Sequence, residues 1–272
     1  MKKLDDCRLD CKEETIREFK ELYKNGVRNI TEVTNVGMGR DVEYIKEVSE
    51  KSGIDIICAT GFYKEPFYPE FVYENDEKKL AAFMKKEITE GIEGTGIKAR
   101  IIGEIGTSKD VITEAEMKVF KAAILAHLET GIPITTHTSL GTMGHEQIEL
   151  FKLYGVELDK VVIGHVDLTG NVEYILDMLY KGAYVEFDTI GKENYLPDEK
   201  RVEMIKEIEK RELIDRVFLS LDITRKSNMR YNGGIGYNYI FEYFIPKMKE
   251  SGIKGSSIEK MLKYNPKKFL TR

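Results

Sequence analysis

Short apolar runs alternate with longer amphipathic segments along the whole chain. Seven of the runs are rich in valine and isoleucine and are mostly apolar at successive positions: 27–33, 54–60, 98–105, 132–136, 160–166, 183–189 and 216–222. Strands that are buried on both faces have this character, because neither side of the strand meets water. The pattern therefore predicts seven buried strands.

The segments between the runs carry apolar residues three or four positions apart, which is the spacing of an amphipathic helix. The first, EETIREFKELYKNG, places Ile16, Phe19 and Leu22 on one face and ends at Gly26. Further helices are predicted near 40–52, 77–91, 113–130, 143–154, 171–181, 198–212, 236–251 and 257–263. Alternation of strands and helices predicts a mainly parallel sheet with right-handed crossovers.

Seven strand–helix repeats within 272 residues favour a TIM-type (β/α)₈ barrel. The alternative is a doubly wound open sheet, which needs no eighth strand. Because the chain opens with a helical pattern, the barrel interpretation lacks its first strand. Neither a low-complexity linker nor a break in composition divides the sequence. We therefore predict a single (β/α) barrel domain over residues 1–272, truncated at its N terminus.

Composition narrows the class of protein. The chain is 42% hydrophobic and 33% charged, as soluble globular proteins are. A net charge of −5 without a long basic block argues against nucleic acid and anionic membranes as partners. No apolar run is long enough to cross a bilayer, and the opening MKKLDDCRLDCKEE has no signal-peptide core. Three cysteines, an odd number, indicate a reducing compartment, so we expect a cytoplasmic protein.

Polar side chains stand at the carboxyl ends of several predicted strands. Glu104 follows ARIIG, His137 follows IPITT, His165 ends VVIGH, and Asp222 follows VFLSL. In a barrel these strand ends meet on one face. Imidazole nitrogens and carboxylate oxygens bind divalent transition metals, which activate water as a nucleophile, and a nearby carboxylate accepts the proton. The pattern predicts a metal centre for hydrolysis of a small-molecule substrate.

Each of these residues also has a structural interpretation. A single histidine at a strand end is commonly a hydrogen-bonded structural residue, and Glu104 alone could form a salt bridge. Asp167 and Asp188 could be metal ligands. They are equally consistent with helix caps or with residues that hydrogen-bond to the ligands. His127 and His145 fall in helical segments, and we expect both at the surface.

The segments IIGEIGTS, ITTHTSLGTMGHEQ, VVIGHVDLTGN, GAYVEFDTIGKENYLPDEKR and LSLDITRKS together resemble the phosphotriesterase-related family of the amidohydrolase superfamily. The resemblance extends from CRLD, near residue 7, to NPKKFL, near the C terminus. It implies a (β/α)₈ barrel with a two-metal centre, usually zinc. It also implies hydrolysis, in which a metal-activated water attacks an ester, lactone or phosphoester centre.

The resemblance also implies roles for individual residues. His137 and His165 correspond to ligands of the more exposed metal, and Glu104 corresponds to the carboxylate that bridges the two metals. Asp222 matches the ligand of the more buried metal, which is also the catalytic proton acceptor.

Two further residues are expected to contact substrate, from their position alone. They are Arg225, just beyond Asp222, and Tyr63, in the segment GFYKEPFYPE. The segment NMRYNGGIGYNY, at 228–239, is interpreted either as a mobile cover over the site or as an ordinary surface loop.

The sequence departs from the family at its start. Family members open with a strand that carries a His-x-His motif, which supplies two ligands to the buried metal, whereas the first histidine here is His127. We therefore expect one zinc ion to be retained, at Glu104, His137 and His165, and a second ion to be held only weakly. A truncated or misassigned start is favoured, because a barrel that lacks a strand exposes two unpaired edges.

Three alternatives to an active hydrolase are open. The first is an inactive or weakly active metal-binding barrel, which the missing His-x-His motif favours. The second is a Schiff-base aldolase, which requires a desolvated lysine at a strand end and is disfavoured because these ends carry His, Glu and Asp. The third is a partner-binding scaffold. No apolar stripe in the sequence supports it, although an unpaired barrel edge would promote a homo-oligomer.

Overall fold

The computed structural model describes residues 5–271. Its seven strands form one parallel sheet in the order β1 to β7. The strands are β1 (Asn29–Glu32), β2 (Asp55–Thr60), β3 (Ile101–Thr107), β4 (Ile134–Thr138), β5 (Val161–Ile163), β6 (Tyr184–Phe187) and β7 (Val217–Leu219). Each strand lies in or overlaps one of the seven predicted runs, so the strand pattern of the sequence is confirmed. The α/β class with a parallel sheet is confirmed with it.

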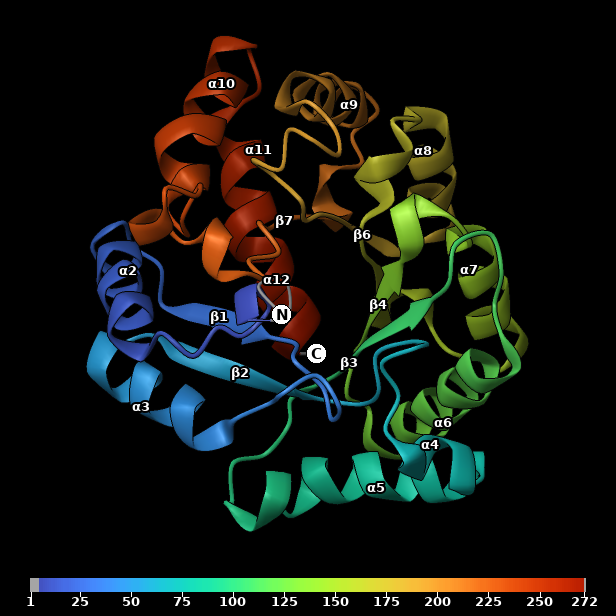
Figure 1. Cartoon of the computed structure of the whole chain (residues 1–272). Helices are drawn as coiled ribbons and strands as arrows, with labels where there is room; N and C mark the ends of the chain where they lie inside the picture. Colours follow the sequence, from blue (N-terminus) through green and yellow to red (C-terminus); the bar gives the residue numbers. More distant parts are fainter. Residues whose placement is uncertain (1–4, 272) are drawn as a thin grey trace.

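The sheet curls around a central axis, and the helices surround it on the outside (Figure 1). Each strand pairs with the next one along the chain. Ile30 of β1 lies opposite Ile56 of β2, and Ile102 of β3 lies opposite Ile134 of β4. Strands β1 and β7 are the two edges of this sheet, and within residues 5–271 they are not paired with each other. The carboxyl ends of all seven strands consequently open on one face.

Helices follow most strands, as the periodicity predicts. The α-helices are α2 (Lys12–Lys24), α3 (Val42–Ser52), α4 (Glu70–Glu74), α5 (Glu77–Thr89), α6 (Glu114–Thr130), α7 (Gly144–Leu153), α8 (Val172–Lys181), α9 (Asp198–Lys210), α10 (Ile245–Glu250), α11 (Gly255–Glu259) and α12 (Asn265–Thr271). Helix α4 was not predicted, because five residues are too few to display a helical period. Two π-helical turns, η8 (Ile240–Phe244) and η9 (Lys260–Tyr264), join the helices near the C terminus. Within residues 5–271, no helix combines the length and apolar character needed to cross a bilayer.

Local sequence signals set the helix ends. Helix α6 begins with a capping box. The Thr113 side chain accepts from the Glu116 backbone N–H, and the Glu116 side chain accepts from the Thr113 backbone N–H. It ends at Gly131, whose φ of 72° is the left-handed conformation that glycine adopts without steric cost. Helix α3 likewise begins at the cap Asp41 and ends at Gly53. These ends fix where each loop at the strand termini begins.

Aromatic side chains pack against one another near the beginnings of β6 and β7. The ring of Tyr184 lies 5.0 Å from that of Phe218 and 5.2 Å from that of Phe269 on α12. All three are buried. The opposite end of the sheet, by contrast, is lined by polar side chains. The candidate functional side chains are therefore gathered at the carboxyl ends of the strands, where parallel barrels carry their sites.

A fully buried arginine joins the loops after β5 and β6 to the start of α9 at this polar end. The Arg201 guanidinium, on α9, donates to Asp167 Oδ2 at 2.7 Å, Asp198 Oδ1 at 2.9 Å and Thr189 Oγ1 at 2.7 Å. Asp167 follows β5 and Thr189 follows β6. Burial, together with nearby Asp188, raises the pKa of Asp167 to about 6 against the opposing effect of Arg201. Asp167 is thus a partner of this arginine.

We predict that Arg201→Met destabilises the fold strongly. The substitution leaves Asp167 and Asp198 buried without their cation, and breaking a buried pair costs about 3–5 kcal/mol. The midpoint of urea unfolding measures the loss. Lys200→Met is the matched control, because Lys200 is exposed and, within residues 5–271, forms its ion pair with exposed Glu203, a contact worth about 0–1 kcal/mol. Equal losses in the two variants would show that the buried network does not stabilise these loops.

Candidate metal centre

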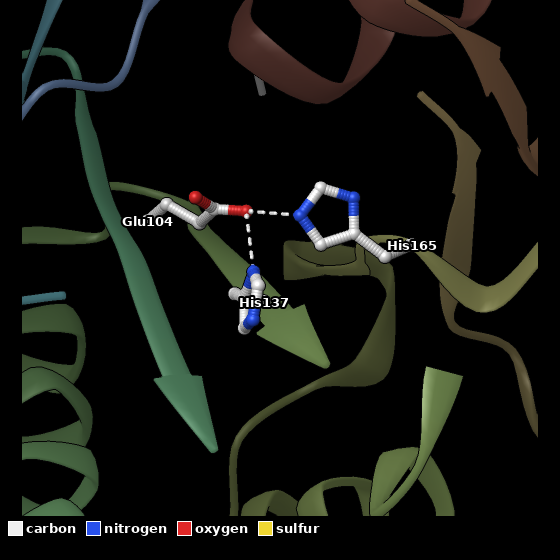
Figure 2. Close-up of side chains that lie close together, drawn as sticks. All are labelled: Glu104, His137 and His165. Carbon is white, nitrogen blue, oxygen red and sulfur yellow. Dashed lines mark ion pairs between the residues drawn. The ribbon is translucent and has the colours of Figure 1, made fainter. Parts of the chain in front are cut away.

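Three of the predicted ligands converge at the carboxyl ends of neighbouring strands. Glu104 lies on β3, His137 on β4, and His165 just beyond β5 (Figure 2). Glu104 Oε1 is 3.2 Å from His165 Nε2 and 3.6 Å from His137 Nδ1. The two imidazole rings are 4.5 Å apart and nearly perpendicular. One donor atom from each residue lies within 4.8 Å of the other two, which is a spacing that one metal ion can bridge.

Asp188 fixes the orientation of His165. Its Oδ1 lies 2.8 Å from His165 Nδ1, and the backbone N–H of His165 donates to the same carboxylate at 3.0–3.1 Å. With Nδ1 occupied in this way, Nε2 is the nitrogen that faces Glu104. Gly164 permits the close approach, because a Cβ there would lie 2.5 Å from Thr136 O and 3.0 Å from Asp188 Oδ2.

His137 is held by groups on both sides of its ring. Nε2 lies 3.2 Å from Ser139 Oγ, which in turn donates to Thr107 O at 2.7 Å. On the other side, Tyr63 Oη lies 3.1 Å from Nδ1, and the two rings meet edge to face at 4.9 Å. Tyr63, predicted to contact substrate, therefore touches the triad directly.

A buried glutamine, Gln147 of α7, braces the strand that carries His137. Its Nε2 donates to His137 O and to Thr107 Oγ1, both at 2.9 Å, and its Oε1 accepts from Thr136 Oγ1 at 2.6 Å. The side chain is completely buried. Gln147 thus links β3, β4 and α7 immediately behind the triad, a role that the sequence analysis did not recognise.

The three side chains differ in their affinity for protons. Burial alone would raise the pKa of Glu104, but hydrogen bonds to His137 and His165 outweigh it and hold that pKa well below its usual range. Burial lowers the pKa of His137, and the neighbouring Glu104 only partly offsets the effect. The pKa of His165 is raised well above its usual value, because Asp188 and Glu104 overcome the cost of burying the imidazolium.

Asp222 lies shortly beyond β7, next to the triad and outside it. Its carboxylate forms an ion pair with Lys192, a residue of the loop after β6. Burial raises the pKa of Asp222 to about 6, although Lys192 and His165 act to lower it and Glu104 raises it further. Within residues 5–271, the group of close ligand atoms contains three of the four predicted ligands and omits Asp222.

The other candidate residues take varied positions. Arg225 is exposed, and its charge acts on Asp6, so its contact with substrate remains a prediction. His145 is half-buried, with Nδ1 3.3 Å from Asp177. The expectation that His127 lies at the surface was wrong: it is 6% exposed, and its Nδ1 lies 2.8 Å from Ile132 O, because the last turn of α6 packs on the approach to β4.

The segment 228–239 is held at both ends by one glutamate of α2. Glu18 Oε1 accepts from the backbone N–H of Arg230 at 2.8 Å, and its Oε2 accepts from that of Tyr237 at 2.9 Å. These bonds favour the interpretation as an anchored surface segment.

Two residues of the site escaped the sequence analysis besides Gln147. Lys192 pairs with Asp222, and Glu186 of β6 shares a hydrogen bond with Asp188. Burial and the neighbouring carboxylates raise the pKa of Glu186 well above its usual value. Glu186 and Asp188 are two positions apart at the end of β6, which places both side chains on the same face. The spacing in the sequence could therefore have predicted that these two carboxyl groups lie close together.

Comparison with known proteins agrees with this architecture. The phosphotriesterase homology protein of Escherichia coli is 48% identical over 264 residues, which are 97% of this chain and 90% of that protein. Its crystal structure, with phosphate in the active site, superposes with a TM-score of 0.96 and covers 98% of this chain and 92% of that one. An N-acetyltaurine hydrolase of Dictyostelium discoideum is 34% identical over 99% of this chain and 76% of its own length. The structure of a lactonase from Listeria monocytogenes is 30% identical, with a TM-score of 0.94, over 99% of this chain and 89% of that one.

A parallel sheet with its imidazole and carboxylate groups gathered at the carboxyl ends of the strands defines a hydrolytic enzyme of the α/β class, as its relatives are. The model of the phosphotriesterase family matches residues 1–270, and the chain belongs to that family.

We predict that Gln147→Leu destabilises the protein by about 1–3 kcal/mol, because it leaves buried polar groups of Thr107 and His137 without a partner. Urea unfolding gives the change. The adjacent Glu146→Ala is the control, since Glu146 is exposed and its loss is expected to stay within about 0.5 kcal/mol. A Gln147→Leu protein as stable as the control would contradict the bracing role.

Proposed function

We propose that this protein is a zinc-dependent hydrolase in which Glu104, His137 and His165 hold one divalent ion. The observation that carries the proposal is the convergence of their three donor atoms within 4.8 Å. Three protein ligands that leave a position open are the usual arrangement of catalytic zinc. The donor set suits the ion: two imidazoles and one carboxylate, with Nδ1 of His165 already engaged by Asp188.

The residues around the triad suit acid–base work. A divalent ion bound there would supply a Lewis acid that activates water and polarises the oxygen of the scissile group. Asp222, with its pKa raised to about 6, is suited to accept a proton near neutral pH and return it to the leaving group. Burial and nearby carboxylates raise the pKa of Tyr63, so its phenol keeps its proton and serves as a hydrogen-bond donor toward the substrate.

We infer a small molecule with an ester, lactone or phosphoester centre as the substrate. The relatives named for hydrolysing N-acetyltaurine and lactones favour attack at an acyl carbon. Arg225, at the exposed rim, is proposed to contact the distal part of the substrate.

The fold is proposed to be a TIM-type (β/α)₈ barrel in one domain over residues 1–272. The curled parallel sheet, in which each strand pairs with the next along the chain, supports this proposal.

We predict that chelation abolishes hydrolysis and that zinc restores it. The full-length protein should retain one tightly held zinc per chain, from the single triad. His137→Ala should lose this zinc and lower kcat/KM by roughly a hundredfold or more, since even outer partners of ligands are worth 10–100-fold. The assay uses 4-nitrophenyl acetate, γ-butyrolactone, diethyl 4-nitrophenyl phosphate and N-acetyltaurine, with metal content measured by mass spectrometry.

His145→Ala is the control, because His145 lies on α7 beside Asp177 and outside the triad. It should keep its zinc and its activity. Activity that survives chelation, or two tightly held zinc ions per chain, would contradict the proposed centre. Zinc binding without turnover of any probe would instead identify an inactive metal-binding barrel.

We predict that Asp188→Asn weakens zinc binding about 10–100-fold while leaving the ligand set intact. The carboxylate orients His165 through Nδ1 and the backbone N–H, and an amide replaces only part of that interaction. Isothermal titration with Zn²⁺ measures the affinity. Asp177→Asn is the matched control, because Asp177 lies beside His145, a histidine outside the triad. Equal affinities in both variants would show that Asp188 does not position His165.

A further inference from the structure

A half-buried lysine, Lys64, lies beside the triad in the segment that follows β2. The preceding residue, Tyr63, touches the ring of His137. The ammonium of Lys64 lies 5.8 Å from the centre of the Tyr63 ring and 6.0 Å from that of Phe67, distances at which an aromatic face attracts a cation. Burial chiefly lowers the pKa of His137, and the positive charge of Lys64 adds to this effect. Lys64 therefore belongs to the surroundings of the triad.

The backbone on both sides of Lys64 is held in place. The N–H of Gly106, on β3, donates to Tyr63 O at 2.6 Å. The N–H of Phe67 donates to Lys64 O at 2.8 Å and closes a turn. Gly106 also makes room for two side chains, because a Cβ there would lie 3.1 Å from the Cβ of His137 and 3.2 Å from that of Lys64. The stem of Lys64 is thus packed against β3 next to His137.

The charge of Lys64 has no carboxylate partner within residues 5–271. Its ammonium donates to Glu65 O at 3.1 Å, whereas the carboxylate of Glu65 accepts from Tyr73 Oη at 3.0 Å. Lys192, another lysine of the site, differs in this respect, because it forms an ion pair with Asp222. A partly buried charge attracts an opposite charge more strongly than an exposed one does. Lys64 therefore favours an anion that comes from outside the chain.

The position of Lys64 indicates which part of a substrate it meets. One aromatic ring, that of Tyr63, separates its ammonium from His137. A reacting group held at the triad and a second group held at Lys64 can therefore belong to one small molecule, joined by a short spacer. The ring of Phe67, which is 49% exposed, offers an apolar contact to such a spacer.

We propose that Lys64 binds an anionic group, a carboxylate or a sulfonate, at the end of the substrate distant from the bond that is hydrolysed. The inference rests on the proposed hydrolytic function of the triad and narrows its substrates to small acyl compounds that carry a negative charge. Arg225 is exposed, so solvent screens its charge more fully, and Lys64 contributes more to the selection of an anion.

A matched pair of esters tests the proposal on full-length, zinc-loaded protein. Mono-4-nitrophenyl glutarate carries a free carboxylate, and its methyl ester has the same reacting group without the charge. The wild type is expected to have the higher kcat/KM for the anionic ester. Lys64→Met removes the charge, so the ratio of kcat/KM for the anionic ester to that for the methyl ester should fall at least about tenfold, mainly through KM, because a hydrogen bond to a charged group is lost.

Two variants serve as controls. Lys64→Arg retains a cation and should keep most of the preference for the anionic ester. Lys118, on α6, also donates to a backbone carbonyl, that of Asn75 at 2.9 Å. Lys118→Met removes the same charge from the protein and should keep the wild-type ratio. An equal fall of the ratio in Lys64→Met and Lys118→Met would overturn the role of Lys64, because net charge alone would then explain the preference.

Calorimetry measures anion binding separately from hydrolysis. N-acetyltaurine, which carries a sulfonate, and neutral N-acetylethanolamine are titrated into metal-free, full-length protein. The wild type is expected to bind N-acetyltaurine at least about tenfold more tightly than Lys64→Met does. N-acetylethanolamine should not distinguish the two proteins. Equal affinities of both proteins for N-acetyltaurine would contradict the binding of an anion by Lys64.

The outcomes separate this inference from the proposed function. Hydrolysis of both glutarate esters with a ratio that Lys64→Met leaves unchanged would overturn the role of Lys64 and leave the triad standing. Hydrolysis of no probe by the zinc-loaded wild type would refute the proposed function, and the calorimetric comparison would then decide whether Lys64 binds an anion. Circular dichroism checks folding, and Lys64→Gln is a second neutral variant should Lys64→Met unfold.

Discussion

Carboxylates buried at the open end of the sheet must be matched by positive charge, and this requirement organises the whole site. An unpaired buried carboxylate is too costly to keep ionised. Three matches meet the requirement: Glu104 with His165, Asp222 with Lys192, and Asp167 with Arg201. At Glu186, burial and the neighbouring carboxylates of Asp188 and Glu104 outweigh the charge of His165, and the pKa is raised well above its usual value.

These matches also explain why the loops hold their shape. The loops after β5 and β6 contribute buried Val166 and Ile190 to the core. Arg201 joins the polar parts of these loops and the start of α9 through Asp167, Thr189 and Asp198. The same loop then presents Lys192 to Asp222. The ion pair between Arg201 and Asp167 is thereby linked to the ion pair between Lys192 and Asp222 through one short segment of backbone.

The strands and the triad could be predicted from the sequence because their signals are local. Strands buried on both faces are apolar at successive positions, and parallel strand ends meet on one face, so His137 and His165 had to lie near each other. Lys192 and Gln147 could not be found in this way, since each is defined by a partner on a different element. His127 was misplaced for the same reason: its helical period does not reveal what packs against the last turn of α6.

The two sides of the site differ in the groups that surround their carboxylates. His165 lies between Asp188 and Glu104, and one donor atom each of Glu104, His137 and His165 lies within 4.8 Å of the other two. On the other side, Asp222 is paired with the ammonium of Lys192, which is covalently part of the chain. The three donor atoms that could hold a metal ion therefore converge on the side of His165, and Asp222 lies beside them with a cation of its own.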